Sequence, residues 1–119
     1  MNYDVEFYTT ADGECPTEDF LDKLSPSNEL PFVDRMIRLL EQYGNELKRP
    51  HVDILRDHIW ELRIRTKRQI RLLYFFFSRN RIIITHGFIK KDKKVGDVEI
   101  ERAIRYREDY LSIHKGPMK

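Results

Sequence analysis

Basic side chains are concentrated in the middle of the sequence, where they could bind or cleave a phosphate-rich polymer. Residues 47–94 hold 14 lysines and arginines against 4 acidic residues, whereas residues 1–46 hold 3 basic and 11 acidic residues. Residues 95–119 hold 5 of each, so the formal net charge of +2 conceals this division. Clusters of this kind bind polyanions because neutralising phosphates releases their condensed counterions. A solvated charged surface is the alternative explanation.

The segment Trp60–Arg65 carries two of these arginines in a strand-like pattern. Alternation with period two places Glu61, Arg63 and Arg65 on one face and apolar residues on the other. Neighbouring arginines on one face repel each other unless an anion or a carboxylate lies between them. The pattern therefore predicts phosphate binding, with a solvated outer face as the alternative.

The next apolar run, residues 70–77, contains a single charge, Arg71. A run that is apolar on both faces is typical of a central strand covered from two sides. We expect Arg71 to lie at the wall of a cleft; the alternative is an ion pair with Glu61 across the sheet. The phenylalanines of this run are expected in the core rather than in a base-stacking platform.

Residues 82–94 lead from a hydrophobic strand into a lysine cluster. His86 near the strand end could exchange a proton, because an unperturbed histidine has a pKa of about 6.5, or it could be structural. The lysines following the strand are placed to contact a phosphodiester, with a solubilising loop as the alternative. They are Lys90, Lys91, Lys93 and Lys94.

The last helical segment offers tyrosines. At spacings of four, three and one, Arg102, Tyr106, Asp109 and Tyr110 are predicted to share one rim. Tyrosine there could pack as a half-buried core residue, stack a base or relay a proton. The sequence has one cysteine and neither a glycine-rich phosphate loop nor a zinc signature or nucleophile elbow. We therefore expect chemistry without a metal or cofactor.

Periodicity predicts the elements that position these groups. Three β-like runs separated by short polar connections predict sequential antiparallel hairpins. Helices are predicted from Pro16, whose ring suits a first turn, and through the apolar repeat that ends at Gly44. A last helix is expected to start with Asp97 as its N-cap and to end near Leu111. The predicted strands are Asn2 to Tyr8, Ile59 to Arg65, Ile70 to Ser78 and Arg81 to Ile89.

These elements, in the order β-α-α-β-β-β-α, predict one α+β domain over residues 1–119, with a small, mainly antiparallel sheet packed on a helical hairpin and a C-terminal helix. The longest apolar stretch, Leu72 to Phe77, is far shorter than the roughly 18 residues of a membrane span. With no export signal and one thiol, we expect a cytoplasmic protein without a membrane anchor.

The order of motifs resembles the HigB-like branch of the RelE/ParE toxin superfamily. The similarity rests on W-E-L-R-I, I-R-L-L-Y-F-F-F, I-I-I-T-H-G-F-I-K-K-D-K-K and E-I-E-R-A-I-R-Y-R-E-D-Y, with P-T-E-D-F-L-D-K-L and L-L-E-Q-Y-G-N-E-L in the N-terminal half. The chain departs from these toxins at Asp57-His58, where they commonly carry a glycine in the turn.

The resemblance implies a RelE-like fold whose basic concave face cuts messenger RNA, usually on the ribosome. Strand arginines and lysines and C-terminal tyrosines are the family's usual participants, and the matching positions are Arg63, Arg71, Lys90, Lys91 and Tyr106 or Tyr110. It also implies a helix-turn-helix antitoxin of the HigA type, in a complex that could be a heterotetramer. The antitoxin is expected to cover the basic face, or alternatively to dock on the acidic helices Pro16 to Tyr43.

The predicted reaction is metal-independent cleavage in which the RNA's own 2′-hydroxyl attacks the adjacent phosphate. Arg63 and Arg71 are assigned to the phosphate, Lys90 or His86 to proton transfer, and Tyr106 or Tyr110 to a base or the leaving group. The remaining cations are expected to bind RNA: Arg65, Lys67, Arg68, Lys91, Lys93 and Lys94.

Two rival functions share the same fold. One is an inhibitor of DNA gyrase like that of the ParE branch, and the other is an inactive phage-derived remnant.

Overall fold

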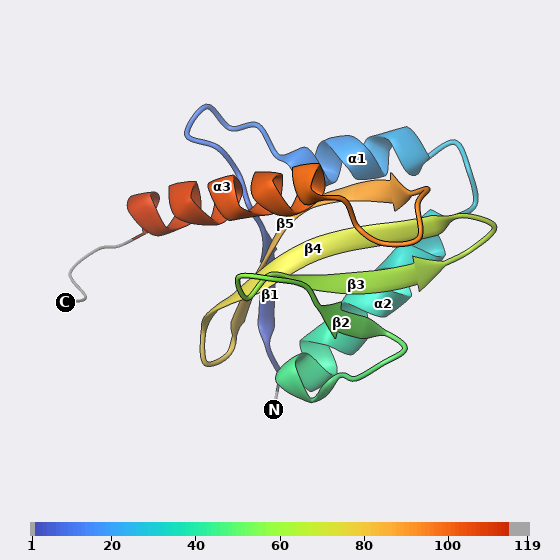
Figure 1. Ribbon diagram of the computed structural model, residues 1–119, viewed down its shortest axis with the longest axis horizontal. Coiled ribbons are helices and arrows are strands. Elements are labelled where there is room, and N and C mark those ends of the chain that lie inside the picture. The colour runs from blue at the N-terminus through green and yellow to red at the C-terminus, as the bar shows by residue number, and fades with distance from the viewer. Residues whose placement is uncertain (1, 115–119) are drawn as a thin grey trace.

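The computed structural model describes residues 2–114, which form a five-stranded sheet with helices on both faces (Figure 1). The strand order is β1-β5-β4-β3-β2, with β1 parallel to β5 and every other pair antiparallel. The predicted α+β class and RelE-like architecture are confirmed. The strands are β1 (Asp4–Phe7), β2 (Val52–Ile54), β3 (Trp60–Arg65), β4 (Gln69–Ser78) and β5 (Arg81–Lys90).

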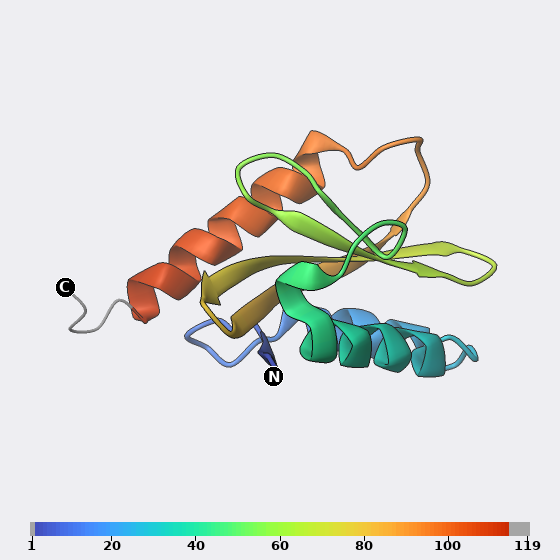
Figure 2. The same ribbon diagram turned by 90° about the horizontal axis from the view of Figure 1, so that it is seen from below.

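The helices are α1 (Pro16–Leu24), α2 (Leu30–Tyr43) and α3 (Asp97–Ile113), and a 3₁₀ turn, Gly44–Glu46, follows α2. α1 and α2 cover one face of the sheet and α3 covers the other (Figure 2). Phe20 of α1 packs closely on β5 because Gly87 has no side chain; a Cβ there would lie 2.5 Å from the Phe20 ring. Among residues 2–114, no helix is long and apolar enough to cross a membrane.

The core has two layers that meet at β4. Leu72 and Tyr74 of β4 pack toward α1 and α2, whereas Leu73 and Phe75 pack toward α3. All four side chains are at most 3% exposed. The prediction of a central strand covered from both sides is therefore confirmed, and Phe75 is a core residue as expected.

Two local predictions need revision, and the turn at Asp57-His58 has an unusual backbone conformation. β2 was not predicted, because a three-residue strand is too short to show a period. Asp97 is the first residue of α3 and Gly96 is the N-cap, without a side-chain capping bond; the Asp97 carboxylate instead lies 3.5 Å from Arg56. The turn that departs from the family pattern places Asp57 and His58 at φ 56° and 62°, the region that glycine adopts most easily.

Candidate functional site

Polar side chains form aligned rows on the sheet face that carries α3. Cα pairing aligns neighbouring positions of β3, β4 and β5, and alternation directs their side chains to this face. The row beneath α3 is buried, and the next two are progressively more exposed. The rows are Glu61, Leu73 and His86; Arg63, Arg71 and Phe88; and Arg65, Gln69 and Lys90. The last two rows together are the basic floor.

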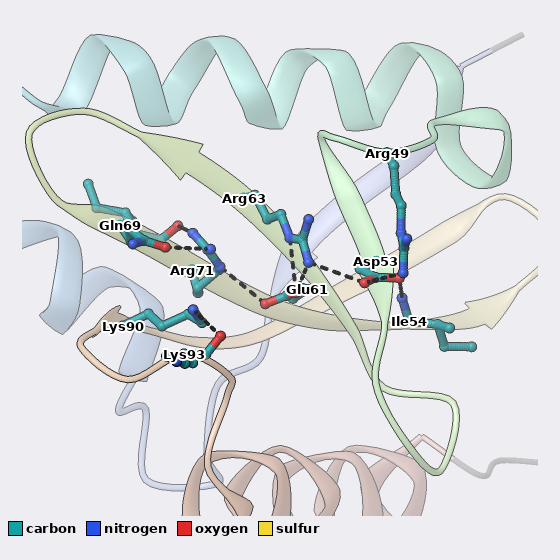
Figure 3. Close-up of polar contacts among 10 residues, drawn as sticks. Arg49, Asp53, Ile54, Glu61, Arg63, Gln69, Arg71, Lys90 and Lys93 are labelled. Carbon is teal, nitrogen blue, oxygen red and sulfur yellow. Dashed lines mark hydrogen bonds and ion pairs between the residues drawn. The ribbon is translucent and has the colours of Figure 1, made fainter.

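Glu61 is the carboxylate that separates the two arginines at the centre of this face (Figure 3). Its Oε2 accepts a hydrogen bond from Arg63 Nε at 3.0 Å, and its Oε1 accepts one from Arg71 Nε at 3.1 Å. The Glu61 side chain is only 3% exposed. Adjacent arginines require either a bound anion or a carboxylate between them, and in this fold the Glu61 carboxylate lies between them.

Arg71 is a buried residue and does not line an open cleft wall. Its side chain is 3% exposed, and its other donors are used by the Ile70 carbonyl at 3.1 Å and the Gln69 side chain at 3.0 Å. Burial lowers the pKa of Arg71, although the Glu61 charge opposes this. The ion pair weighed as the alternative is thus formed, and the expected cleft-wall position is not.

Arg63 retains partial access to solvent, at 24% side-chain exposure. Its Nη2 lies 3.1 Å from Asp53 Oδ2, and Arg49 reaches the same oxygen at 2.9 Å. Burial raises the pKa of Asp53, but hydrogen bonds from Arg49 and the Ile54 N–H outweigh it and the net shift is downward. Figure 3 shows the resulting chain of alternating charges from Arg49 to Arg71.

The cations at the outer end of the basic floor are not neutralised in this way. Among residues 2–114, Arg65 and the lysines after β5 form no ion pair. Arg65, Lys91, Lys93 and Lys94 are exposed. Lys90 is half-buried, and its ammonium donates a hydrogen bond to the Lys93 carbonyl at 2.8 Å, which holds the loop against the strand. The lysine loop, residues 90–94, therefore leaves positive charge available to a ligand.

Lys67 and Arg68 lie at the tip of the β3–β4 hairpin, directly beyond the outermost row. Arg68 hydrogen-bonds both carboxylate oxygens of Glu29, which also accepts a bond from Thr66 Oγ1 at 2.6 Å. The Arg68 bond is the main reason that the pKa of Glu29 falls to about 2. Arg68 thus fastens the hairpin to the α1–α2 connection, whereas exposed Lys67 forms no ion pair among the described residues.

His86 is held beneath α3 in a buried hydrogen-bonded group. It is 3% exposed; its Nε2 lies 2.9 Å from Glu99 Oε1 and its Nδ1 lies 3.0 Å from Thr85 Oγ1. The bond to His86 is the largest reason that the pKa of Glu99 is lowered. His86 borders a hollow of about 240 Å³ between α1 and α3, which it shares with Arg102 and Tyr106. Through its hydrogen bond to Glu99, His86 holds the first turn of α3 against the sheet.

The two tyrosines do not share a rim. Tyr106 stacks on Tyr8 with ring centroids 4.8 Å apart and contacts the edge of His86. Tyr110 is 2% exposed, packs on Phe77 with centroids 5.1 Å apart, and donates to Glu6 at 3.0 Å. Burial raises its pKa, and the bond to Glu6 adds to this. Phe77 and Arg71 are six strand residues apart, roughly 20 Å, so Tyr110 lies outside the basic floor.

Sequence reasoning passed over two residues of the floor. Phe88 is a half-buried aromatic side chain opposite Arg71, and Gln69 bonds Arg71 from the neighbouring row. Strand alternation in the sequence could have identified both residues. It puts Phe88 on the same face as His86 and Lys90, and Gln69 on the same face as Arg71. A half-buried aromatic ring beside cations that form no ion pair among the described residues is suited to stacking an unpaired base.

The described chain, residues 2–114, has no group of three histidine, cysteine, aspartate or glutamate side chains placed to hold a metal ion.

Comparison with known proteins gives one family. A family model described as phage derived protein Gp49-like (DUF891) matches residues 19–108, which include all three rows and most of α3. No curated protein sequence matches the chain.

Proposed function

Because the chain belongs to the phage-derived Gp49-like family, a family of RelE/HigB-like toxins of toxin–antitoxin systems, we propose that it is an endoribonuclease that cleaves messenger RNA. Within that family, we assign it to the HigB-like branch on the motifs quoted above. Its place of action would be the cytoplasm, where translated messages are found.

The observation that carries the proposal is the division of charge on the basic floor. Arg63 keeps part of its guanidinium accessible, and Arg65 and Lys90 lie one row farther out on the same face. The three cations can contact a phosphodiester together with the lysine loop beside them. Phe88 lies in the same row as Arg63, one row inward from Arg65 and Lys90, and can stack a base.

The reaction proposed uses the RNA as its own nucleophile. The 2′-oxygen forms a bond to the adjacent phosphorus, the bond from phosphorus to the 5′-oxygen breaks, and the products are a 2′,3′-cyclic phosphate and a free 5′-hydroxyl. The 2′-hydroxyl loses a proton and the leaving oxygen gains one. Lys90 lies in the outermost row of the floor and is assigned to proton transfer in preference to His86, which is buried under α3.

The inner residues have a supporting role in this proposal. Arg71 acts through Glu61, and Glu61 orients Arg63 toward the floor by its bond to Nε. Arg63 is a catalytic residue in the proposal, whereas Glu61 and Arg71 are positioning residues. Tyr106 and Tyr110 are left without a part in the chemistry, because one stacks on Tyr8 and the other is in the core.

The test is cleavage of a labelled RNA by the purified chain in excess chelator, followed by analysis of the ends. The expected products carry a cyclic phosphate and a 5′-hydroxyl, and cleavage that requires magnesium would contradict the mechanism. A parallel assay with translating ribosomes determines whether the ribosome is required.

Induction in cells distinguishes the three functions: message loss supports the nuclease, DNA damage signalling supports gyrase inhibition, and unimpeded growth supports an inactive remnant.

A toxin family implies an antitoxin partner. We propose that this partner is a helix-turn-helix protein of the HigA type and that the two form a heterotetramer. Co-expression of the neighbouring reading frame, followed by determination of the mass of the complex, tests both the partner and the stoichiometry.

A further inference from the structure

The edge of β3 is open beyond the end of β2. β2 pairs only with residues 60–62 of β3, from Ile54 opposite Trp60 to Val52 opposite Leu62. The next contact is the Arg63 N–H, which donates to the His51 carbonyl at 2.8 Å. Alternate residues of a strand direct their N–H and C=O groups to the same side. The N–H and C=O of Arg65 therefore point past the end of β2, where the described chain places no strand.

A groove runs between this open edge and α2. Its volume is about 520 Å³, and its apolar lining includes Phe32 and Met36 of α2, Pro50, and Ile64 of β3. Its basic lining comprises Arg35 of α2 and Arg63 and Arg65 of β3. A second hollow shares Phe32 and continues past the hairpin tip along Thr66 and Lys67. Phe32 is 42% exposed although it lies on a helix that packs on the sheet. The groove thus combines apolar side chains with free backbone hydrogen-bonding groups.

The charged side chains that line the first groove are basic, and Glu29, which lines the second hollow, is paired with Arg68. Arg35 lies over the Phe32 ring at 5.6 Å, and Arg65 projects from the opposite face of β3. Within residues 2–114, neither arginine forms an ion pair. The two faces of the strand edge therefore differ: the side of Ile64 is apolar, and the side of Arg65 is cationic. An added strand would meet these two surfaces with alternate residues.

We propose that the β3 edge and the groove beside it bind an extended segment of a partner protein as an additional strand, with apolar and acidic side chains alternating along that segment. Its backbone pairs with Arg65, its apolar residues contact Phe32 and Met36, and its acidic residues face Arg65. Arg35, at the rim, adds further attraction for an acidic chain. Open strand edges are the surfaces on which such pairing occurs, and pockets for alternate side chains give it specificity.

The groove and the proposed RNA surface lie mainly on opposite faces of β3 and meet at its edge, because Arg63 and Arg65 also line the groove. Phe32, Arg35 and Met36 belong to α2, on the face of the sheet opposite α3 and the basic floor. An RNA strand would use the cations but would leave the apolar lining and the backbone groups unmatched. The variants that test the groove are therefore taken from α2, outside the basic floor, so that either proposal can fail without the other.

The probe for this site is a fluorescein-labelled ten-residue peptide of alternating glutamate and valine, titrated with the full chain and followed by anisotropy. We expect saturable binding, weakened about tenfold by Phe32→Ala or Arg35→Glu, as for residues central to an interface. Arg105→Glu on α3 removes the same charge from an exposed position outside the groove and should bind as the unmodified chain does. RNA cleavage should be unchanged in the Phe32 and Arg35 variants.

Backbone pairing has its own readout. In an added strand, only every second N–H faces β3. Two further peptides, N-methylated at all valines or at all glutamates, should therefore differ in affinity by about tenfold or more. A peptide with lysine in place of glutamate should bind much more weakly than the original.

Several outcomes would overturn the proposal. They are the absence of saturable binding, equal affinity of the two N-methylated peptides, and undiminished binding by the Phe32 and Arg35 variants. Self-association of the chain that is lost in Phe32→Ala would assign the groove to a second copy instead. Displacement of the peptide by an RNA oligonucleotide whose own binding requires Phe32 would assign it to RNA.

Discussion

The inner and outer parts of the basic floor contain the same kinds of side chain under different constraints. In the inner part, Arg63 and Arg71 are paired with Glu61 of the adjoining row, and Arg63 is also paired with Asp53 of β2. The side chains of Arg71 and Glu61 are each 3% exposed. In the outer part, Arg65 and the lysine loop keep their charges free. A paired, buried charge maintains geometry, and a free one is available to a ligand. Substitutions in the two parts should therefore affect different measurements.

The largest effect is expected from Glu61→Gln. The substitution keeps the shape of the side chain but leaves the Arg71 guanidinium buried without a counter-charge. Breaking a buried pair from one side costs about 3–5 kcal/mol, and denaturant unfolding measures the loss. Glu108→Gln, at an exposed position of α3, should change stability by less than about 0.5 kcal/mol. A Glu61→Gln protein as stable as the Glu108 control would show that the inner pair does not support the fold.

Arg63→Ala should act on chemistry more than on stability. It removes the partly exposed guanidinium assigned to the phosphate, while Arg49 remains bonded to Asp53 and Arg71 to Glu61. Loss of one such donor costs about a hundredfold in kcat/KM, or about 2.7 kcal/mol of barrier. The measurement is RNA cleavage by a variant whose folding has been checked. Full activity in a folded Arg63→Ala/Arg65→Ala protein would remove both arginines from the site.

The lysine loop should govern affinity and its salt dependence. Replacing Lys91, Lys93 and Lys94 with alanine should weaken RNA binding about tenfold and make the plot of log K against log salt shallower by about 0.7 per lost phosphate contact. Stability should stay within about 0.5 kcal/mol, because these side chains are exposed and unpaired. Titration of a labelled RNA at several salt concentrations gives both values. An unchanged slope would mean that the loop does not touch phosphates.

Glu29→Gln, outside both parts of the floor, should have the smallest effect. Hydrogen bonds, chiefly from Arg68, lower the pKa of Glu29 from 4.5 to about 2. A lowered pKa stabilises the fold above the unfolded value, and this contribution disappears as the pH falls through the folded value. Because Arg68 is 46% exposed, we expect only about 1 kcal/mol at neutral pH. Unfolding midpoints of the two proteins should differ above pH 4.5 and converge near pH 2. A pH-independent difference would point to packing instead of charge.

Local patterns determined much of the fold before any tertiary contact was considered. Period-two alternation in β3, apolar residues on both faces of β4, and the short turns between strands predicted the meander and its central strand, because backbone geometry alone sets those features. The same alternation placed Glu61, Arg63 and Arg65 on one face. β2 was not predictable in this way because three residues are too few to show a period. The start of α3 was mispredicted because the Asp97 carboxylate lies beside Arg56, a residue distant in the sequence.

The sequence by itself therefore determined which residues share a face, and only the tertiary structure decided which of them are accessible. Strand pairing brought Arg71 opposite Arg63 and within reach of Glu61, and the packing of α3 buried His86 and Tyr110. Burial and ion pairing depend on these long-range contacts, and a local pattern carries no information about them. For that reason Arg63 and Arg71, equivalent in the sequence pattern, differ in the fold: one can meet a phosphate and the other holds its neighbour in place.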